Sequence, residues 1–182
     1  MPDMVLPERL ARPALRSPLD GLGPIERPGS LVVTPAPELA RMALRGAPDA
    51  LGQAFGLALP TTPCRAVVDG DRAALWLGPD EWLLLLPAGT PDGAGRQIEG
   101  GAVTEISHRQ VGLVLEGKGA ETALAVGCPL DLHLTAFPVG MCTRTVFGKA
   151  EIVLWRQDAT RFHLEVWRSF APYVHGLLAA GA

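Results

Sequence analysis

The sequence predicts an α+β fold made of two halves of antiparallel sheet with helices, related by a pseudo-twofold axis. The prediction rests on two similar stretches, PCRAVVDGDRAALWLGPDEWLLLLP (63–87) and MCTRTVFGKAEIVLWRQDATRFHLEVWR (141–168). In each stretch a cysteine precedes a glycine by six residues, Cys64 before Gly70 and Cys142 before Gly148. Two copies of a unit are too few for a solenoid, which needs at least about three. They fit a domain in which each half covers the apolar face of the other.

Each copy is expected to form three strands, because its segments are rich in β-branched or aromatic residues and are bounded by turn residues. The expected strands are Cys64–Val68, Ala73–Leu77 and Trp82–Leu86 in the first copy, and Met141–Phe147, Ala150–Arg156 and Arg161–Trp167 in the second. Each copy has a tryptophan shortly after its glycine, Trp76 and Trp155. After the last strand, apolar residues recur at helical spacing from Phe170 to Leu178, which predicts a helix there.

Proline and glycine mark the ends of the remaining elements. Pro37–Arg45 is expected to be a helix that begins at its proline and ends before Gly46, and Pro48–Phe55 repeats the pattern. The other expected elements are the strands Leu31–Thr34, Val103–Ser107 and Gln110–Glu116 and the helix Lys118–Val126. The predicted organisation is an extended proline-rich arm at 1–30, followed by one two-lobed domain at 31–182 with lobe one at 31–87, a linker at 88–102 and lobe two at 103–182.

The arm at 1–30 contains six prolines and three glycines, a density that blocks both helices and sheet hydrogen bonds. Leucines and one isoleucine are spaced along it, from Leu6 to Ile25. Two interpretations stay open. The arm is either a frayed terminus or a segment that lies on a partner chain and uses its apolar residues as anchors.

Charge and composition argue against several classes of protein. The net charge is −3 and no run of lysine or arginine is present, which argues against a nucleic-acid-binding surface. The three cysteines are widely spaced and predict neither a disulfide framework nor a CxxC metal-binding pair. No segment has the length of a membrane span or the apolar core of a signal peptide, so we expect no membrane contact and a cytoplasmic location.

Two groups of residues have the composition of a reactive site, but both are better explained as structure. Ser107 and His108 are neighbours in an extended segment, where adjacent side chains point to opposite faces and cannot form a nucleophile–base pair. Cys128, Asp131 and His133 lie in an expected loop, which does not hold their side chains at the fixed distances that a metal site needs. They are also fewer than the four ligands of a structural zinc site. We therefore expect no catalytic residue and no metal ligand in this chain.

Two corners of the predicted fold carry residues suited to contact a ligand or a partner chain. His108 and Arg109 form a polar corner between two strands. Trp167, Arg168 and Phe170 form a strand-to-helix corner, and these residue types are enriched at the buried centres of protein interfaces. In a monomer such residues most often belong to the core.

Arg144 is a further candidate contact, because within the expected strand Met141–Phe147 it shares a largely apolar face with Cys142 and Val146. A charge in such a place must be paired. The candidate carboxylates are Glu151, Glu165 and Asp131. The favoured interpretation is a structural salt bridge, and the functional alternative is contact with a carboxylate or a partner at the edge of the sheet.

Five idiosyncratic strings stand out in this sequence: LWLGPDEWLLL (75–85), SHRQ (107–110), CPLDLH (128–133), RTVFGKAE (144–151) and FHLEVWRSFAPYVHGLL (162–178). Through them the chain, from Ser17 onward, resembles the gamma subunit family of heterotetrameric sarcosine oxidase. The resemblance implies a fold like the folate-binding domain of aminomethyltransferases, a two-halved α+β domain with a pseudo-twofold. This agrees with the internal repeat, which was found from the residues alone.

The resemblance also implies a role. The family's parent complex oxidises the N-methyl group of sarcosine and yields glycine, peroxide and a one-carbon unit, as formaldehyde or on tetrahydrofolate, with FAD, FMN and NAD in its larger subunits. The chain is then expected to be an accessory, non-catalytic subunit that binds no cofactor itself and packs chiefly against the large folate-binding subunit. Related transferases carry an acidic pair where this chain has Ile152 and Val153, so a carboxylate for acid–base chemistry is missing.

Two alternatives stay open beside that role. The first is a folate-type ligand-binding protein, with a pocket between the two halves in which Arg144 or Arg109 meets a glutamate tail. The second is a stand-alone one-carbon transferase. The three hypotheses differ in whether the isolated chain binds folate and whether it turns over a substrate.

Overall fold

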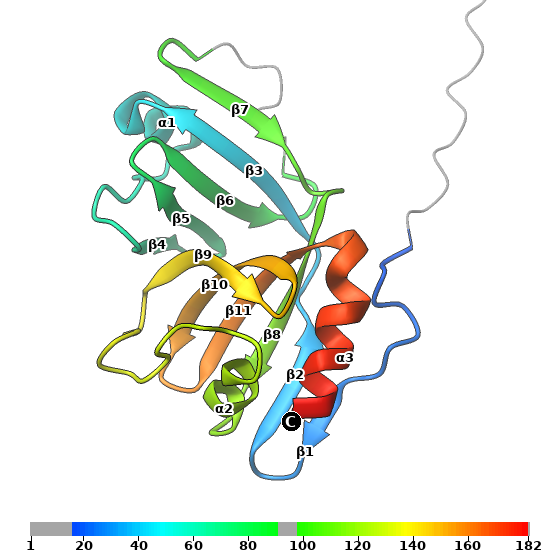
Figure 1. The fold of residues 1–182 in the computed structure, drawn as a ribbon. Coiled ribbons are helices and arrows are strands. Elements are labelled where there is room, and N and C mark those ends of the chain that lie inside the picture. The colour runs from blue at the N-terminus through cyan, green and yellow to red at the C-terminus, as the bar shows by residue number, and fades with distance from the viewer. Residues whose placement is uncertain (1–15, 91–97, 182) are drawn as a thin grey trace, which may run out of the picture.

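Two antiparallel sheets face each other, and helices cover their outer sides (Figure 1). The computed structural model describes residues 16–90 and 98–181. One sheet has six strands in the order β1-β2-β8-β11-β10-β9, and the other has five in the order β4-β5-β6-β3-β7. This is the predicted class of fold.

The elements have the following bounds. The six-stranded sheet contains β1 (Ile25–Arg27), β2 (Leu31–Pro35), β8 (Gln110–Glu116), β11 (Arg161–Trp167), β10 (Ala150–Asp158) and β9 (Cys142–Phe147). The five-stranded sheet contains β4 (Ala66–Asp69), β5 (Arg72–Gly78), β6 (Glu81–Pro87), β3 (Leu39–Gly46) and β7 (Gly101–Glu105). The helices are α1 (Pro48–Phe55), α2 (Ala120–Ala125) and α3 (Ala171–Gly181), with the 3₁₀ turn η1 (Arg168–Phe170) before α3.

The two copies found in the sequence fold in the same way. Each is an antiparallel meander, β4-β5-β6 in one sheet and β9-β10-β11 in the other. Their first hairpins turn at Gly70 (φ 62°) and Gly148 (φ 59°), which take the left-handed conformation that glycine adopts without steric cost. Their second hairpins share a register shift, after Trp76 in β5 and after Arg156 in β10. The predicted pseudo-twofold relation is confirmed.

The two tryptophans that helped to reveal the repeat are not equivalent in space. Trp76 packs toward α1, on the outer side of the five-stranded sheet, whereas Trp155 packs between the two sheets beside Val153. Trp155 is one residue further from its turn than Trp76 is. Because side chains alternate along a strand, that difference of one residue turns the side chain to the opposite face.

Each sheet takes strands from the opposite half of the chain: the six-stranded sheet takes the pair β1 and β2, and the five-stranded sheet takes its edge strand β7. β2 comes before β3 in sequence, yet it pairs with β8 of the six-stranded sheet through Val33↔Leu115. β7 comes before β8, yet it pairs with β3 of the five-stranded sheet through Leu44↔Val103. The crossing segments β2–β3 and β7–β8 therefore connect the sheets to each other (Figure 1). Neither sheet is complete without residues of both halves.

The prediction of a helix over Pro37–Arg45 is wrong, because this segment forms β3, an interior strand between β6 and β7. Its residues favour helices as single amino acids, but the side chains alternate in the manner of a strand. Met42 and Leu44 are fully buried toward α1, and Arg41 points to the opposite face. Pairing on both edges outweighs the intrinsic helix propensity, which is a weak preference.

The core has three parts. The largest lies between the six-stranded sheet and helices α2 and α3, and a second lies between the five-stranded sheet and α1. The third lies between the sheets and consists of Ala73, Leu75, Leu83, Leu85, Cys142, Val153 and Trp155. Both sheets are therefore buried on both faces, as their continuous apolar runs predict.

The described part of the proline-rich arm, residues 16–30, lies on the chain's own six-stranded sheet. β1 pairs with β2, and Leu19 and Ile25 are buried in the largest core cluster. His175 in α3 is 3.0 Å from the Gly23 carbonyl, which fixes the arm beside this helix. Residues 1–15 lie outside the described residues. No helix in the described part of the chain is both long enough and apolar enough to span a membrane.

Two buried tryptophans allow a test of the packing. Trp82 and Trp155 are each more than nine-tenths buried, so Trp82→Ala and Trp155→Ala should each lower the free energy of unfolding by about 3–5 kcal/mol. Trp82 Nε1 donates to the Pro60 carbonyl at 2.7 Å, whereas Trp155 Nε1 has no partner in the described chain. Phenylalanine should therefore cost about 1 kcal/mol more at position 82 than at 155. Denaturant unfolding measures this, and a loss below about 1 kcal/mol for either alanine variant would contradict the packing.

Candidate functional site

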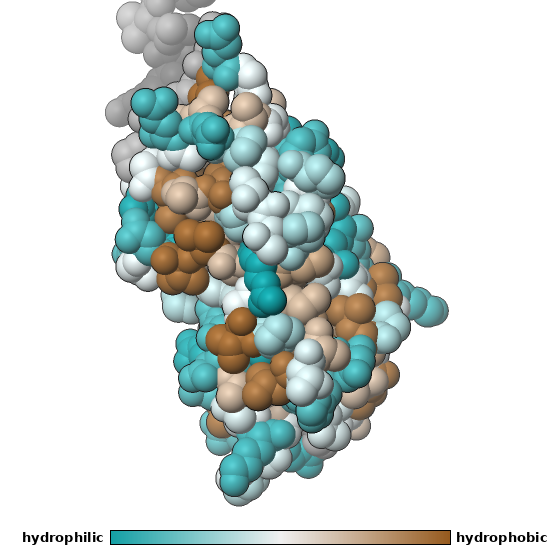
Figure 2. Space-filling view, turned by 90° about the vertical axis from the view of Figure 1, so that its left-hand side faces the viewer, coloured by the Kyte–Doolittle hydropathy of each residue, from teal (hydrophilic) through white to brown (hydrophobic). Residues whose placement is uncertain are grey.

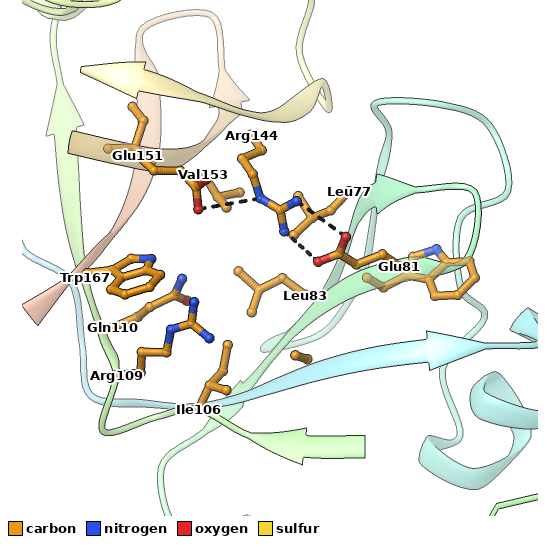
Figure 3. A pocket seen from close by; sticks show the side chains of 13 residues that line it. Leu77, Glu81, Leu83, Ile106, Arg109, Gln110, Arg144, Glu151, Val153 and Trp167 are labelled. Carbon is orange, nitrogen blue, oxygen red and sulfur yellow. Dashed lines mark hydrogen bonds and ion pairs between the residues drawn. The ribbon is translucent and has the colours of Figure 1, made fainter. Parts of the chain in front are cut away.

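A cleft between the two sheets brings together three of the predicted contact residues (Figure 3). Arg144 comes from β9, Trp167 from the end of β11, and Arg109 from the turn before β8. The cleft has a volume of about 90 Å³, which is room for a few water molecules or one small polar group. Its apolar lining includes Leu77, Leu83, Ile106 and Val153.

Arg144 belongs to a series of charges that spans the cleft. Its guanidinium donates to both carboxylate oxygens of Glu81, at 2.6 and 3.4 Å, and its Nε is 3.8 Å from Glu151 (Figure 3). Glu81 also pairs with Arg45, which contacts Asp80. The hydrogen bond with Glu81 raises the pKa of Arg144, and burial opposes this by less. Arg144 thus joins β9 to β6 of the other sheet, and its charge is already compensated.

Arg109 has a different environment. Its guanidinium carbon is 4.0 Å from the centre of the Trp167 ring, a cation–π contact. The pairing of Trp167 with Gln110 and a 2.9 Å hydrogen bond from the Arg168 N–H to the Arg109 carbonyl hold this arrangement. Within residues 16–90 and 98–181, Arg109 forms no ion pair. Carboxylate partners are present for Arg41, Arg45, Arg72, Arg144, Arg156 and Arg161.

Trp167, which contacts Arg109, is followed closely in sequence by two more exposed aromatic side chains. Trp167, Phe170 and Tyr173 expose 37%, 39% and 40% of their area, although each is large and apolar. Arg168 follows Trp167 and donates from Nη2 to the Arg16 carbonyl at 2.5 Å, so it too has no carboxylate partner in the described chain. We call Arg109, Trp167, Arg168, Phe170 and Tyr173 the aromatic corner. It combines exposed apolar area with two cations held by neutral groups.

His108 lies beside this corner but points elsewhere. His108 and Arg168 line a second cavity of about 710 Å³, which shares Gln110 with the cleft. His108 is exposed. Ser107 does not pair with it, because Ser107 Oγ accepts from the Arg41 N–H at 2.8 Å and its own N–H donates to Glu105 at 2.7 Å. The serine thus holds the backbone of β3.

The sequence prediction missed a buried polar group between the sheets. Arg41 of β3 donates from Nε and Nη2 to the two carboxylate oxygens of Glu165 in β11, at 2.6 and 3.0 Å. His163 Nε2 is 2.7 Å from Glu165 Oε1 and donates to it. All three side chains are at least 95% buried. Such a doubly bonded pair is stable in the interior only because its hydrogen-bonding groups are satisfied.

This group depends on a close approach at Gly112 in β8. A Cβ there would lie 2.7 Å from Ala36 Cβ and 2.9 Å from Glu165 Oε1. A side chain at this position would collide with the carboxylate, so glycine leaves the space that Glu165 occupies. Glu165 was among the carboxylates predicted for Arg144, and that pairing is wrong. Its partner Arg41 was hidden because the segment around it was predicted as a helix.

Ile152 and Val153 occupy the place where related transferases are expected to carry an acidic pair. Both are buried, Ile152 toward the helices and Val153 between the sheets. Glu151 faces the cleft instead. The third carboxylate predicted for Arg144, Asp131, accepts from the His133 N–H at 2.9 Å. No cluster of three or more metal-binding side chains occurs in the described part of the chain.

The architecture is that of the aminomethyltransferase-like proteins. Aminomethyltransferase T of the glycine cleavage system from Bartonella henselae shares the fold, with a TM-score of 0.57 and 14% identity over 80% of this chain and 44% of that one. A chain of heterotetrameric sarcosine oxidase from Corynebacterium sp. U-96, in complex with pyrrole 2-carboxylate, matches at a TM-score of 0.82. Its identity is 27%, over 92% of this chain and 94% of that one.

Sequence comparison leads to one family. Sarcosine oxidase subunit gamma from Corynebacterium sp. strain P-1 is 34% identical over 139 residues, 72% of this chain and 68% of the relative. The gamma subunit from strain U-96 is 36% identical over 138 residues, 72% and 67% of the two chains. The model of the sarcosine oxidase gamma subunit family matches residues 42–182. The chain belongs to this family, as its sequence strings predict.

The buried carboxylate at Glu165 gives the fold a predictable dependence on pH. Burial alone would raise the pKa of Glu165, but the hydrogen bond from His163 and the charge of Arg41 outweigh it and lower the pKa below its usual 4.5. Because the pKa of Glu165 is lower in the folded chain than in the unfolded chain, the ionised Glu165 carboxylate stabilises the fold, and this contribution is complete above pH 4.5. It is lost as the pH falls through the folded-state value.

Glu165→Gln should therefore lower the free energy of unfolding at pH 7 by about 3–5 kcal/mol, because Arg41 keeps its charge in the interior without a counter-charge. The variant should also lose part of the wild type's dependence on pH below 4.5. Glu116→Gln is the matched control, since Glu116 is exposed in its pair with Arg161 and should cost less than about 1 kcal/mol. Denaturant unfolding at several pH values measures both effects. Equal losses in the two variants would contradict the role given to the buried pair.

Proposed function

We propose that this chain is an accessory, non-catalytic gamma subunit of a sarcosine oxidase complex. The observation that carries the proposal is the combination of membership in the gamma subunit family with apolar residues, Ile152 and Val153, where a transferase needs carboxylates. The wider reaction, oxidative demethylation of sarcosine to glycine with peroxide and transfer of the one-carbon unit to tetrahydrofolate, is then carried out by the larger subunits.

The dimensions of the cleft support assigning the cofactors to those larger subunits. The cleft, with about 90 Å³ and a lining of both apolar and charged residues, is smaller than the roughly 300–1,000 Å³ of a typical ligand pocket. Its one strong cation on the β9 side, Arg144, is already paired with Glu81. Within this proposal FAD, FMN, NAD and tetrahydrofolate belong to the larger subunits, and the cleft beside Arg144 holds none of them.

The aromatic corner is the surface we propose for contact with the large folate-binding subunit. Interface hot spots are enriched in Trp, Tyr and Arg, and they cluster where an aromatic group and a charge are desolvated together. The Arg109 guanidinium lies 4.0 Å from the centre of the Trp167 ring, and none of its donors is used by a carboxylate of the described chain. An aspartate or glutamate of the partner, flanked by apolar side chains, would supply the missing counter-charge and cover Phe170 and Tyr173.

Co-purification of the assembled complex tests this surface. Trp167→Ala and Arg109→Ala should each weaken association with the larger subunits by at least about tenfold, the loss expected for a hot-spot residue. Arg109→Lys should weaken it too, because lysine keeps the charge but loses the planar stack on the indole. Arg161→Ala is the matched control, since Arg161 is an exposed arginine paired with Glu116. Unchanged assembly of both alanine variants would remove the aromatic corner from the proposal.

A second candidate function, folate-type ligand binding between the lobes, rests on the same unpaired Arg109. With Arg144 engaged, Arg109 is the arginine of the cleft that remains for a glutamate tail. Titration of the full-length chain with tetrahydrofolate separates the two functions. Under the accessory-subunit proposal no binding is expected at micromolar concentration. Micromolar binding that disappears in Arg109→Ala would favour the ligand-binding function instead.

A further inference from the structure

The internal repeat brings two of the three cysteines together. Cys64 and Cys142 occupy the same place in the two copies, six residues before the turn glycine. Equivalent positions of a pseudo-twofold fold are neighbours only where they lie at the axis. This is the case here, because Cys142 N–H donates to the Cys64 carbonyl at 3.0 Å. The join between the two lobes therefore runs through this pair.

The pairing around them is that of an antiparallel ladder. Arg65 bridges Met141, and Ala66 N–H donates to the Gly140 carbonyl at 2.9 Å, so the same register places Cys64 directly opposite Cys142. Covalent geometry limits two Cα atoms joined through such a hydrogen bond to about 7 Å, and the usual value is about 5.5 Å. Disulfides form between Cα atoms roughly 4.4–6.8 Å apart. The backbone spacing is thus within the range that a disulfide needs.

The two thiols differ in their surroundings. Cys142 is fully buried between the sheets, where its Sγ donates to the Trp76 carbonyl at 3.6 Å, and burial raises its pKa to about 12. Cys64 is partly exposed. Cys64 also has a φ of 58°, a conformation that side chains rarely adopt, and it is the one non-glycine residue with positive φ in the described chain. A strained, accessible residue thus lies opposite a buried one.

The strands β4 and β9 meet at one side of the molecule. Figure 1 shows β4 of one sheet next to β9 of the other at the left of the molecule. Figure 2 shows this side with apolar and hydrophilic groups mixed across both lobes, without one continuous apolar cover. Cys64 itself is partly exposed, so a small oxidant can reach it from solvent, whereas Cys142 is fully buried.

We propose that Cys64 and Cys142 form a disulfide that joins the two lobes when the chain meets a peroxide. The Cys64 thiolate attacks one peroxide oxygen, the O–O bond breaks, and the departing hydroxide takes up a proton to become water. The sulfenic acid left on Cys64 is then attacked by the Cys142 sulfur. The S–O bond breaks, and the leaving hydroxide takes the Cys142 proton as a second water. Two thiols are oxidised to one disulfide and the peroxide is reduced to two waters.

The order of the two steps follows from burial. Cys64 reacts first because it is accessible, and Cys142 resolves the sulfenic acid because it lies directly opposite. The raised pKa of Cys142 makes the second step slow at neutral pH and faster as the pH rises, since a thiolate is the better nucleophile. The disulfide would close a loop that contains β4, β5, β6, β7, β8 and α2, so it would resist separation of the two sheets.

Mass spectrometry of the full-length chain tests the disulfide, with hydrogen peroxide as the oxidant and any accompanying subunits left in place. The reduced chain has three alkylatable thiols once denatured. After oxidation we expect one, Cys128, together with a mass lower by two hydrogen atoms and a linked peptide pair containing Cys64 and Cys142. The midpoint of thermal unfolding should rise, and dithiothreitol should reverse each change.

Serine variants of each cysteine make the test decisive. Cys128→Ser should still lose two thiols. Cys64→Ser should keep both of its buried thiols, and Cys142→Ser should keep both of its thiols or gain oxygen on the partly exposed Cys64. Where Cys142→Ser fails to fold, Cys142→Ala serves in its place, because alanine suits the buried site. Oxidation that only adds oxygen to the wild-type chain, or a linked peptide that contains Cys128, would overturn the proposal.

Discussion

The exchange of strands between the two halves of the chain is the constraint on which this fold depends. β2 and β7 each leave their own half of the chain and pair in the opposite sheet. The crossing segments hold the sheets face to face. The apolar residues that lie between the two sheets, among them Leu75, Leu83 and Val153, are buried by this contact. Burial of this kind is the largest favourable contribution to folding. The cleft, the aromatic corner and the cysteine pair all lie along the boundary that the exchange creates.

Polar groups make that boundary specific. Arg41 and Glu165 connect an interior strand of one sheet to an interior strand of the other, and Arg144 and Glu81 connect the edge strand β9 to β6 nearer the surface. Buried ion pairs often add little to stability when they are compared with apolar residues of the same shape. Their effect here is to fix how the sheets are placed, because an apolar contact tolerates small displacements and a doubly hydrogen-bonded pair does not.

The sequence was sufficient for the class of fold and for the repeat, because the three-strand meanders keep their pattern of turn glycines and apolar runs. It was not sufficient for β3, where residues with high helix propensity lie in a strand paired on both edges. That error concealed Arg41, and without Arg41 the natural partner of Glu165 was not visible. Arg109 and Trp167 were found separately as two corners. Only the pairing of β8 with β11 brings them into contact.

Gly112 shows how such a fold limits its own evolution. The carboxylate of Glu165 occupies the volume that a methyl group at Gly112 would need. A side chain there would also lie 2.7 Å from Ala36 Cβ, so it requires the backbone at Ala36 to shift as well as a smaller residue at position 165, and Arg41 must then have lost its charge. The three positions are therefore expected to change together or not at all, so that a single ancestral substitution at any one of them would meet an epistatic barrier.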